Sequence, residues 1–386
     1  MSAAKKSRTY APAPFDAAKP TATALLTIDL DALCGKYRTL ADVAPGATCA
    51  AVRQATGADE AARALAAAGC STFFVATFEE ALAVRTTAPS AMVYALDGLF
   101  PGACADYVAQ KIRPVLSSIE DATDWAAYCV EQDKQYPAAL HVDAGMNRLG
   151  LGHDEALSFR ETTLKPADLA PALLMSHLAC ADTPDHPKNA EQLDRFRQVR
   201  EAFPDCPASL ANSGGIMLGP DFHFDIVRAG VALYGAEAVT GKPPLSPVVQ
   251  LHARISQLHE AEAGETVGYG ASQALERRTR IATICAGYAD GIFRRLGSGN
   301  PENSLIAYID GHPAPVLGRV SMDLVTLDVT NVPQDLVHRG GWAEIIGPHV
   351  NLDDLARKAG TIGYEVLTSL SRRAQRVYIG NTGDSS

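Results

Sequence analysis

The chain has 386 residues, of which 47% are hydrophobic and 20% are charged, and its formal net charge at pH 7 is −10. This composition is that of an ordinary soluble globular protein, long enough for two domains. The acidic balance without a basic stripe argues against nucleic acid as a partner, and the absence of an apolar run of about 18 residues argues against a membrane span.

Residues 1–23 are rich in alanine and proline and lack the apolar stretch of a secretory signal, so we predict a flexible arm. The eight cysteines are scattered and form no C-x-x-C pair. We therefore predict reduced thiols in a cytoplasmic protein, with no metal site.

Short apolar runs alternate with helix-like stretches between residues 24 and 243. The helix-like stretches 59–68, 119–134 and 189–203 carry apolar residues at three- and four-residue spacing. Eight strands separated by helices predict a (β/α)₈ TIM barrel rather than an open sheet. The predicted strands are 48–52, 72–76, 92–96, 113–117, 139–143, 172–177, 209–213 and 227–233.

The pattern changes at about residue 244, where short strands are separated by Gly, Pro and Asp turns. We predict a separate β-rich domain over residues 244–386, with a helix at 352–359 and a last strand at 376–379. The other strands predicted in this domain are 248–258, 280–286, 304–309, 314–317 and 324–329.

Polar residues stand at the ends of several predicted barrel strands, where functional groups collect in this fold. A single histidine at such a place is more often structural, and a single arginine is more often solvated or salt-bridged. Because five strand ends converge on one face, the pattern predicts a ligand site. The residues are Arg53, Arg148, His177, Ser213, Arg228 and Gly230.

Ser213 and Gly230 suggest an anion site, because a hydroxyl and backbone N–H groups freed by small residues can hold a phosphate. The alternative is a pair of tight turns. In TVGYGAS, Tyr269 lies between two glycines, which would leave its phenol accessible. The alternative there is ordinary Gly-Tyr-Gly turn chemistry.

The chain resembles the alanine racemase family of fold type III pyridoxal phosphate enzymes from about residue 26 to residue 380. The resemblance implies a homodimer in which the partner's second domain completes each active site, and a small amino acid or phosphorylated small molecule as ligand. The matching segments are GCSTFFVATFEEALAVR, HVDAGMNRLGL, MSHLACADTPDHP, SLANSGGI, FDIVRAGVALYG, VGYGAS, AGYADGIFRR, GRVSMDLVTLDVT and GYEVLTSLSRR.

The resemblance also implies roles for residues that hold the cofactor. Arg228 would pair with the pyridine nitrogen of pyridoxal phosphate. Ser213, Gly230, Val231 and Tyr364 would hold its phosphate.

Other roles implied by the resemblance concern the amino acid. Tyr269, arriving from the other subunit, would be the acid/base that serves the L-enantiomer, hydrogen-bonded towards His177. Tyr288 would be the entrance tyrosine of the AGYADG motif. The residues around the substrate carboxylate would be Arg148, Met322 and Asp323.

The chain departs from the family at Arg53, where the family has the lysine that carries pyridoxal phosphate. Counted up to the shared Gly69 and Cys70, the segment after Arg53 is roughly three residues shorter than the corresponding segment of the family. A tyrosine that would contact the phosphate is missing with it. No lysine occurs between Lys36 and Lys111. A guanidinium stays protonated and is a poor nucleophile and base, and the loss of a general base costs about 10²–10⁴ in rate.

From these residues we predict a racemase-like protein that is inactive or strongly impaired as an alanine racemase. It would bind pyridoxal phosphate, or another phosphate or carboxylate ligand, without a covalent bond, or bind no cofactor at all. Two alternatives stay open. One is an active alanine racemase that depends on pyridoxal phosphate, and the other is a non-catalytic interaction protein.

Overall fold

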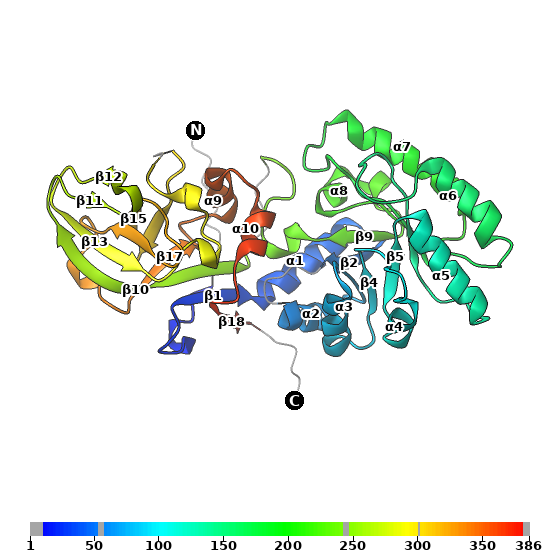
Figure 1. Ribbon diagram of the computed structural model, residues 1–386, viewed down its shortest axis with the longest axis horizontal. Coiled ribbons are helices and arrows are strands. Elements are labelled where there is room, and N and C mark those ends of the chain that lie inside the picture. The colour runs from blue at the N-terminus through cyan, green and yellow to red at the C-terminus, as the bar shows by residue number, and fades with distance from the viewer. Residues whose placement is uncertain (1–10, 53–57, 242–246, 300–301, 381–386) are drawn as a thin grey trace.

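The computed structural model describes residues 11–52, 58–241, 247–299 and 302–380. Two bodies lie side by side along the long axis of the molecule (Figure 1), with the barrel on one side and a β-rich domain on the other. The chain passes between them more than once, because its first described strand lies in the sheet of the second body.

The first body is a parallel eight-stranded sheet in the order β8-β7-β6-β5-β4-β3-β2-β9. The first and last strands of this order, β8 and β9, are joined to each other. Ser209 Oγ donates to Ile226 O at 2.7 Å, and Arg228 N donates to Ala211 O at 2.9 Å. The predicted barrel is therefore confirmed. Its strands are β2 (Thr48–Val52), β3 (Thr72–Val75), β4 (Met92–Ala95), β5 (Arg113–Leu116), β6 (Ala139–His141), β7 (Leu173–Met175), β8 (Ala208–Ser209) and β9 (Ile226–Ala229).

Side chains from these strands fill the barrel, so the interior is a packed core. Phe74 and Tyr94 stack with ring centroids 4.9 Å apart, and Arg113 Nη1 donates to the Tyr94 hydroxyl at 2.8 Å. Because the interior is closed, any ligand site must lie at the strand ends. The apolar residues that share this core are Ala50, Phe74, Tyr94, Val115, Ala139, Leu173, Met175 and Ile226.

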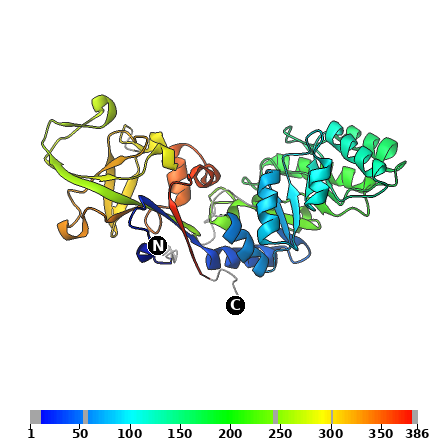
Figure 2. The ribbon, with the colours of Figure 1, turned by 60° about the horizontal axis from the view of Figure 1, so that its bottom comes forward.

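Helices surround the barrel (Figure 2), and local signals in the sequence set where they begin. The Thr77 hydroxyl accepts from Glu80 N at the start of α3, and Ser118 and Asp121 form a capping box at the start of α5. The helices are α1 (Leu30–Val43), α2 (Ala58–Ala67), α3 (Phe78–Thr87), α4 (Cys104–Ala109), α5 (Ile119–Glu131), α6 (His153–Phe159), α7 (Pro187–Ala202) and α8 (Ser213–Leu218).

The second body is built on a sheet in the order β13-β16-β15-β14-β17-β10-β1-β18, with a further pairing of β13 to β10. This confirms the predicted β-rich domain. Its elements are β1 (Ala24–Asp29), β10 (Val249–Ala261), β13 (Thr279–Ile284), β14 (Ile306–Ile309), β15 (His312–Leu317), β16 (Val325–Asp328), β17 (Trp342–Ile346), β18 (Gln375–Ile379), α9 (Leu352–Ala359) and α10 (Gly363–Ser369), together with the two-stranded pair β11 (Thr266–Val267) and β12 (Gln273–Ala274).

Strand β1 pairs antiparallel with β10 and parallel with β18. It leads directly into α1 of the barrel, whose N-cap is Asp29, which accepts from Ala32 N. The sequence did not predict β1, β17 or α10. The domain boundaries at residues 23 and 243 stay predictions.

The described part of the predicted N-terminal arm contacts the second body. Phe15 stacks on Trp342 with ring centroids 5.5 Å apart, and Gln250 Nε2 donates to Ala11 O at 2.6 Å. All eight cysteines lie in the described ranges and are free thiols in this structure. None of the helices in the described part of the chain has the length and apolarity needed to cross a membrane.

Candidate functional site

Arg228 on β9 is a buried cation at the centre of the candidate site. Its side chain is only 3% exposed. Nη1 donates to the Ser209 hydroxyl, and Nη2 donates to Ser176 O at 2.6 Å and to Leu210 O at 3.3 Å. Burial lowers the pKa of Arg228 to about 10, so the guanidinium remains charged at neutral pH. Among the described residues, no carboxylate forms an ion pair with it.

His177 follows β7 and lies against Arg228, with 3.4 Å between Arg228 Nη2 and His177 Nδ1. Burial, assisted by the charges of Arg228 and Arg148, lowers the pKa of His177 to about 3. The imidazole is therefore neutral. Because Nδ1 faces a donor, the proton is assigned to Nε2, which leaves an N–H free to donate.

A second neutral imidazole, His141 at the end of β6, lies 3.3 Å from the Ser117 hydroxyl through Nδ1. Burial, with Arg228 and Arg148 again adding to it, lowers its pKa to about 4. Arg148 itself is exposed, in the loop after β6. Two neutral histidines and two cations thus gather at this end of the barrel, and of these four residues His141 was not predicted from the sequence.

Ser213, Gly230, Val231 and Tyr364, which we call the cradle, come together from three elements. Ser213 Oγ at the start of α8 accepts from Gly230 N at 2.8 Å and from Ala232 N at 3.4 Å. Burial raises the pKa of the Tyr364 phenol to about 12, although it is opposed by hydrogen bonds with Val231 N and the Ser213 hydroxyl. Since Tyr364 lies on α10, the second body contributes to the cradle.

The cradle fits a phosphate group. It offers two hydroxyls and the backbone amides of η4 (Val231–Tyr234), which follows β9 directly. Gly214 lies so close to a neighbouring loop that an added Cβ would come within 2.7 Å of Ala181 O. Larger residues are therefore excluded, and the hydroxyls and amides stay close together.

Three residues predicted to lie near the substrate carboxylate or the entrance gather in the second body. Tyr288 N donates to Ser321 O, and Met322 O accepts from Ala289 N, both at 3.0 Å. Asp323 Oδ1 forms an ion pair with Arg373 Nη2 at 2.8 Å. Tyr288 and Met322 are 44% and 53% exposed, so they present their side chains on the surface of this chain.

Gly287, next to Tyr288, provides a test of this packing. A Cβ at Gly287 would lie 2.3 Å from Met322 O and 2.4 Å from Ser321 O. We expect Gly287→Ala to lower the free energy of unfolding by about 2–3 kcal/mol, because two backbone segments must separate. Urea denaturation followed by circular dichroism measures it. Gly299→Ala is the control, since a Cβ there meets nothing within 4 Å, and an equal loss in both variants would contradict the prediction.

Tyr269 is not brought to His177 within one chain. It lies between β11 and β12 and is 70% exposed. In Figure 1, β11 and β12 lie on the side of the second body that faces away from the barrel. Arg53 falls outside the described residues, so the structure does not test the predicted replacement of a lysine there.

Sequence reasoning missed the residues that hold Arg228 in place. Ser176 directly follows β7, and Ser209 lies on the neighbouring strand β8. Phe74 lies under the guanidinium, with 5.8 Å between its ring centroid and Arg228 Cζ. A signal for the two serines exists, because each is a small polar residue in or next to an otherwise apolar barrel strand.

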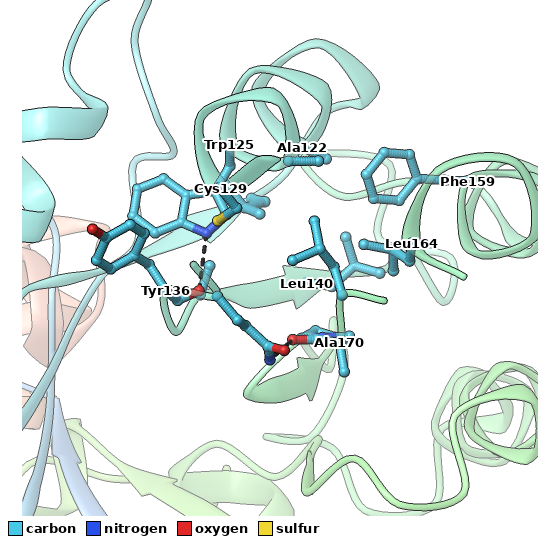
Figure 3. A pocket seen from close by; sticks show the side chains of 14 residues that line it. Ala122, Trp125, Cys129, Tyr136, Leu140, Phe159, Leu164 and Ala170 are labelled. Atoms are coloured by element: carbon cyan, nitrogen blue, oxygen red, sulfur yellow. Dashed lines mark hydrogen bonds between the residues drawn. The ribbon is translucent and has the colours of Figure 1, made fainter. Parts of the chain in front are cut away.

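An apolar cavity of about 30 Å³ lies outside the barrel, between α5, β6 and α6 (Figure 3). Trp125, Cys129, Phe159 and Leu164 line it, and Trp125 Nε1 donates to Tyr136 O at 3.2 Å. It has room for about one water molecule and contains none of the predicted site residues.

Comparison with known proteins bears on both bodies. The family model "Alanine racemase, N-terminal domain" matches residues 28–238, and "Alanine racemase, C-terminal domain" matches residues 248–378. A protein of Rhizobium meliloti named alanine racemase is 44% identical over 371 residues, covering 93% of this chain and 98% of that protein. One of Methylobacterium with the same name is 46% identical over 361 residues, covering 92% and 98%.

Solved structures agree with these matches. The structure of alanine racemase from Bartonella henselae, with covalently bound pyridoxal phosphate, aligns with a TM-score of 0.87 and 39% identity, covering 93% of this chain and all of that one. Alanine racemase from Acinetobacter baumannii aligns with a TM-score of 0.82 and 31% identity, covering 93% and 100%.

Proposed function

The chain belongs to the alanine racemase family, and we propose that it interconverts L- and D-alanine with pyridoxal phosphate as cofactor. The observation that carries the proposal is the joint geometry of Arg228 and the cradle. A buried cation and a phosphate-sized set of hydroxyls and amides lie at the same end of one barrel. Relatives that align over nine-tenths of the chain are named alanine racemase.

In this proposal Arg228 donates to the pyridine nitrogen, and Ser213, Gly230, Val231 and Tyr364 hold the phosphate. Because Arg228 keeps its proton, the ring nitrogen stays unprotonated. When bound, pyridoxal phosphate supplies an electron sink that weakens the Cα–H bond of the amino acid.

The residues around the amino acid have separate roles. Neutral His177 donates from Nε2 to the Tyr269 phenol of a partner chain, which favours the phenolate and so makes it a base for the Cα proton. Tyr288 forms the entrance. The residues near the carboxylate are Arg148, Met322 and Asp323. The proposal requires a homodimer, because Tyr269 lies between β11 and β12 of the second body and does not reach His177 of its own chain.

The proposal is tested by isotope exchange. In D₂O with pyridoxal phosphate and L-alanine, we expect loss of the Cα proton signal in NMR and formation of D-alanine. Tyr269→Phe is expected to slow the reaction about 10²–10⁴-fold, since a general base is lost. Cofactor and alanine without protein are the blank. No exchange above this blank would contradict the proposed activity.

A second candidate function is favoured by one feature of the sequence. Arg53 stands where the family has its lysine, and no lysine occurs between Lys36 and Lys111. In this case the protein binds pyridoxal phosphate without a covalent bond and racemises alanine poorly or not at all. It predicts that the ligand raises the melting temperature by mass action, while borohydride treatment followed by intact-mass measurement shows no adduct. A reduced adduct on any lysine eliminates this candidate.

A further inference from the structure

Lys36 is a buried amine that the proposed function does not use. It lies in the middle of α1 and is only 4% exposed. Its Nζ has no hydrogen-bond partner among the described residues. Burying an ammonium group without a partner costs several kcal/mol of folding free energy. An anion close to Lys36 would offset this cost.

The turn of α1 determines which neighbours Lys36 faces. Helix α1 packs against α2, β2, α8, η4 and β18. Cys34 points to α2, since its Sγ lies 3.4 Å from Ala64 O, and the Tyr37 hydroxyl donates to Cys49 O of β2. Successive residues of an α-helix are about 100° apart, so Lys36 lies at the opposite edge of the buried arc from Cys34. Strand β18 lies on the Cys34 side of α1, because Tyr378 bonds to Glu60 of α2. The neighbours left for the edge of Lys36 are therefore α8 and η4.

The Lys36 side chain also points towards the site end of the barrel. Helix α1 ends at Val43 and β2 begins at Thr48, and the short turn between them is closed by the bond from Ala47 N to Ala44 O. The helix therefore runs antiparallel to β2, so its N-terminal end lies level with the C-terminal ends of the strands. Side chains on a helix lean towards its N-terminus. The amine therefore extends from behind η4 towards the end of the barrel where the cradle lies.

The cradle contains no lysine or arginine among its four described residues. Arg228 is engaged by Ser209, Ser176 and His177 and, in the proposed function, by the ring nitrogen. We propose that Lys36 is the cation that balances the negative charge of a phosphate monoester bound in the cradle. Its charge acts across the backbone of η4, so Lys36 is a positioning residue and does not contact the phosphate. This inference rests on the proposed function for the location of the phosphate.

Titration of Lys36 agrees with this geometry. Burial lowers its pKa to about 7, with the carboxylate of Asp29 opposing the shift. At pH 8 the free protein holds a mostly neutral amine, and a phosphate dianion nearby would raise the pKa and draw in a proton. The other titratable or charged groups on elements packed against α1 are Cys49 on β2, Asp59, Glu60 and Arg63 on α2, Tyr234 on η4, and Arg376 and Tyr378 on β18.

Calorimetric titration with pyridoxine 5′-phosphate tests the inference, because this compound has the ring and phosphate of the cofactor but no aldehyde. In the full-length protein, Lys36→Met is expected to weaken binding about 10- to 100-fold at pH 7, because a favourable charge interaction in a partly buried site is lost. At pH 8, titration in buffers of different ionisation enthalpy is expected to show proton uptake in the wild type beyond that of Lys36→Met.

Tyr37→Phe is the matched control, since it removes a buried hydrogen bond from the same helix without changing its charge. It should keep both the affinity and the proton uptake. Equal affinity and equal proton uptake in the wild type and Lys36→Met would overturn the inference and leave the proposed function standing. No binding by the wild type would overturn both. A borohydride-reduced pyridoxal phosphate adduct on Lys36 would also overturn it, because the amine would then bond to the aldehyde.

Discussion

Two inactive variants of this chain are expected to restore activity when they are mixed. In the proposed homodimer, Arg228→Gln damages the barrel half of a site, and Tyr269→Phe damages the half that the partner chain would supply. After unfolding and refolding together in equal amounts, half of the dimers contain one chain of each kind. Each such dimer has one intact site, so about one quarter of all sites are intact. Racemase activity should therefore rise from about 1% of wild type or less, as expected for loss of a general base, to about one quarter.

The controls for this experiment are each variant refolded alone and a mixture of the two without refolding. Arg228→Gln keeps an amide N–H that can donate to Ser176 O, which favours a folded variant. Circular dichroism and gel filtration check that both variants fold. Activity in the refolded mixture equal to the mean of the separate variants would contradict a site shared between subunits.

Lys36→Met is expected to stabilise the ligand-free protein strongly at low pH. Burial holds the pKa of Lys36 at about 7, about 3.5 units below an ordinary lysine. At 1.36 kcal/mol for each pH unit between the two pKa values, the wild type loses on the order of 5 kcal/mol below pH 7, which an apolar side chain of similar volume avoids. Urea denaturation of both proteins at pH 6.5 measures the difference in the free energy of unfolding.

The pH dependence of that difference has a definite sign. Above the pKa of lysine in the unfolded chain, the amine is neutral in both states and no penalty exists. As the pH falls towards 7, the unfolded chain binds a proton that the folded chain does not, so the penalty grows. Below pH 7 it is constant. The advantage of Lys36→Met should thus be about 2 kcal/mol smaller at pH 9 than at pH 6.5, and an advantage independent of pH would contradict a buried titrating amine.

The barrel could be predicted from sequence because each of its strands is a short apolar run between helical stretches. All eight predicted strands overlap the observed ones, and 48–52 coincides with β2. The strand-end residues followed from the same pattern, since parallel strands in a barrel end on one face. His177, Ser213 and Arg228 therefore gather as expected.

Features that depend on contacts distant in sequence could not be predicted in this way. Strand β1 reads as an ordinary apolar run, and only its pairing with β10 and β18 assigns it to the second body. The neutral state of His177 depends on its burial beside Arg228 and Arg148, which no local pattern records. Lys36 seemed remote from the first barrel strand by residue count, but its helix α1 packs against α8 and η4, which carry the cradle residues Ser213 and Val231.

The position of β1 has a consequence for how the chain folds during synthesis. The second body contains an interior strand from residues 24–29, while its other strands begin at residue 249. A ribosome must therefore make the whole barrel before β1 finds β10, and most of the remaining chain before it finds β18. A fragment that begins after the barrel would leave long edges of β10 and β18 open, the kind of edge that recruits other chains into aggregates. The two bodies are thus separate in space but not independent as folding units.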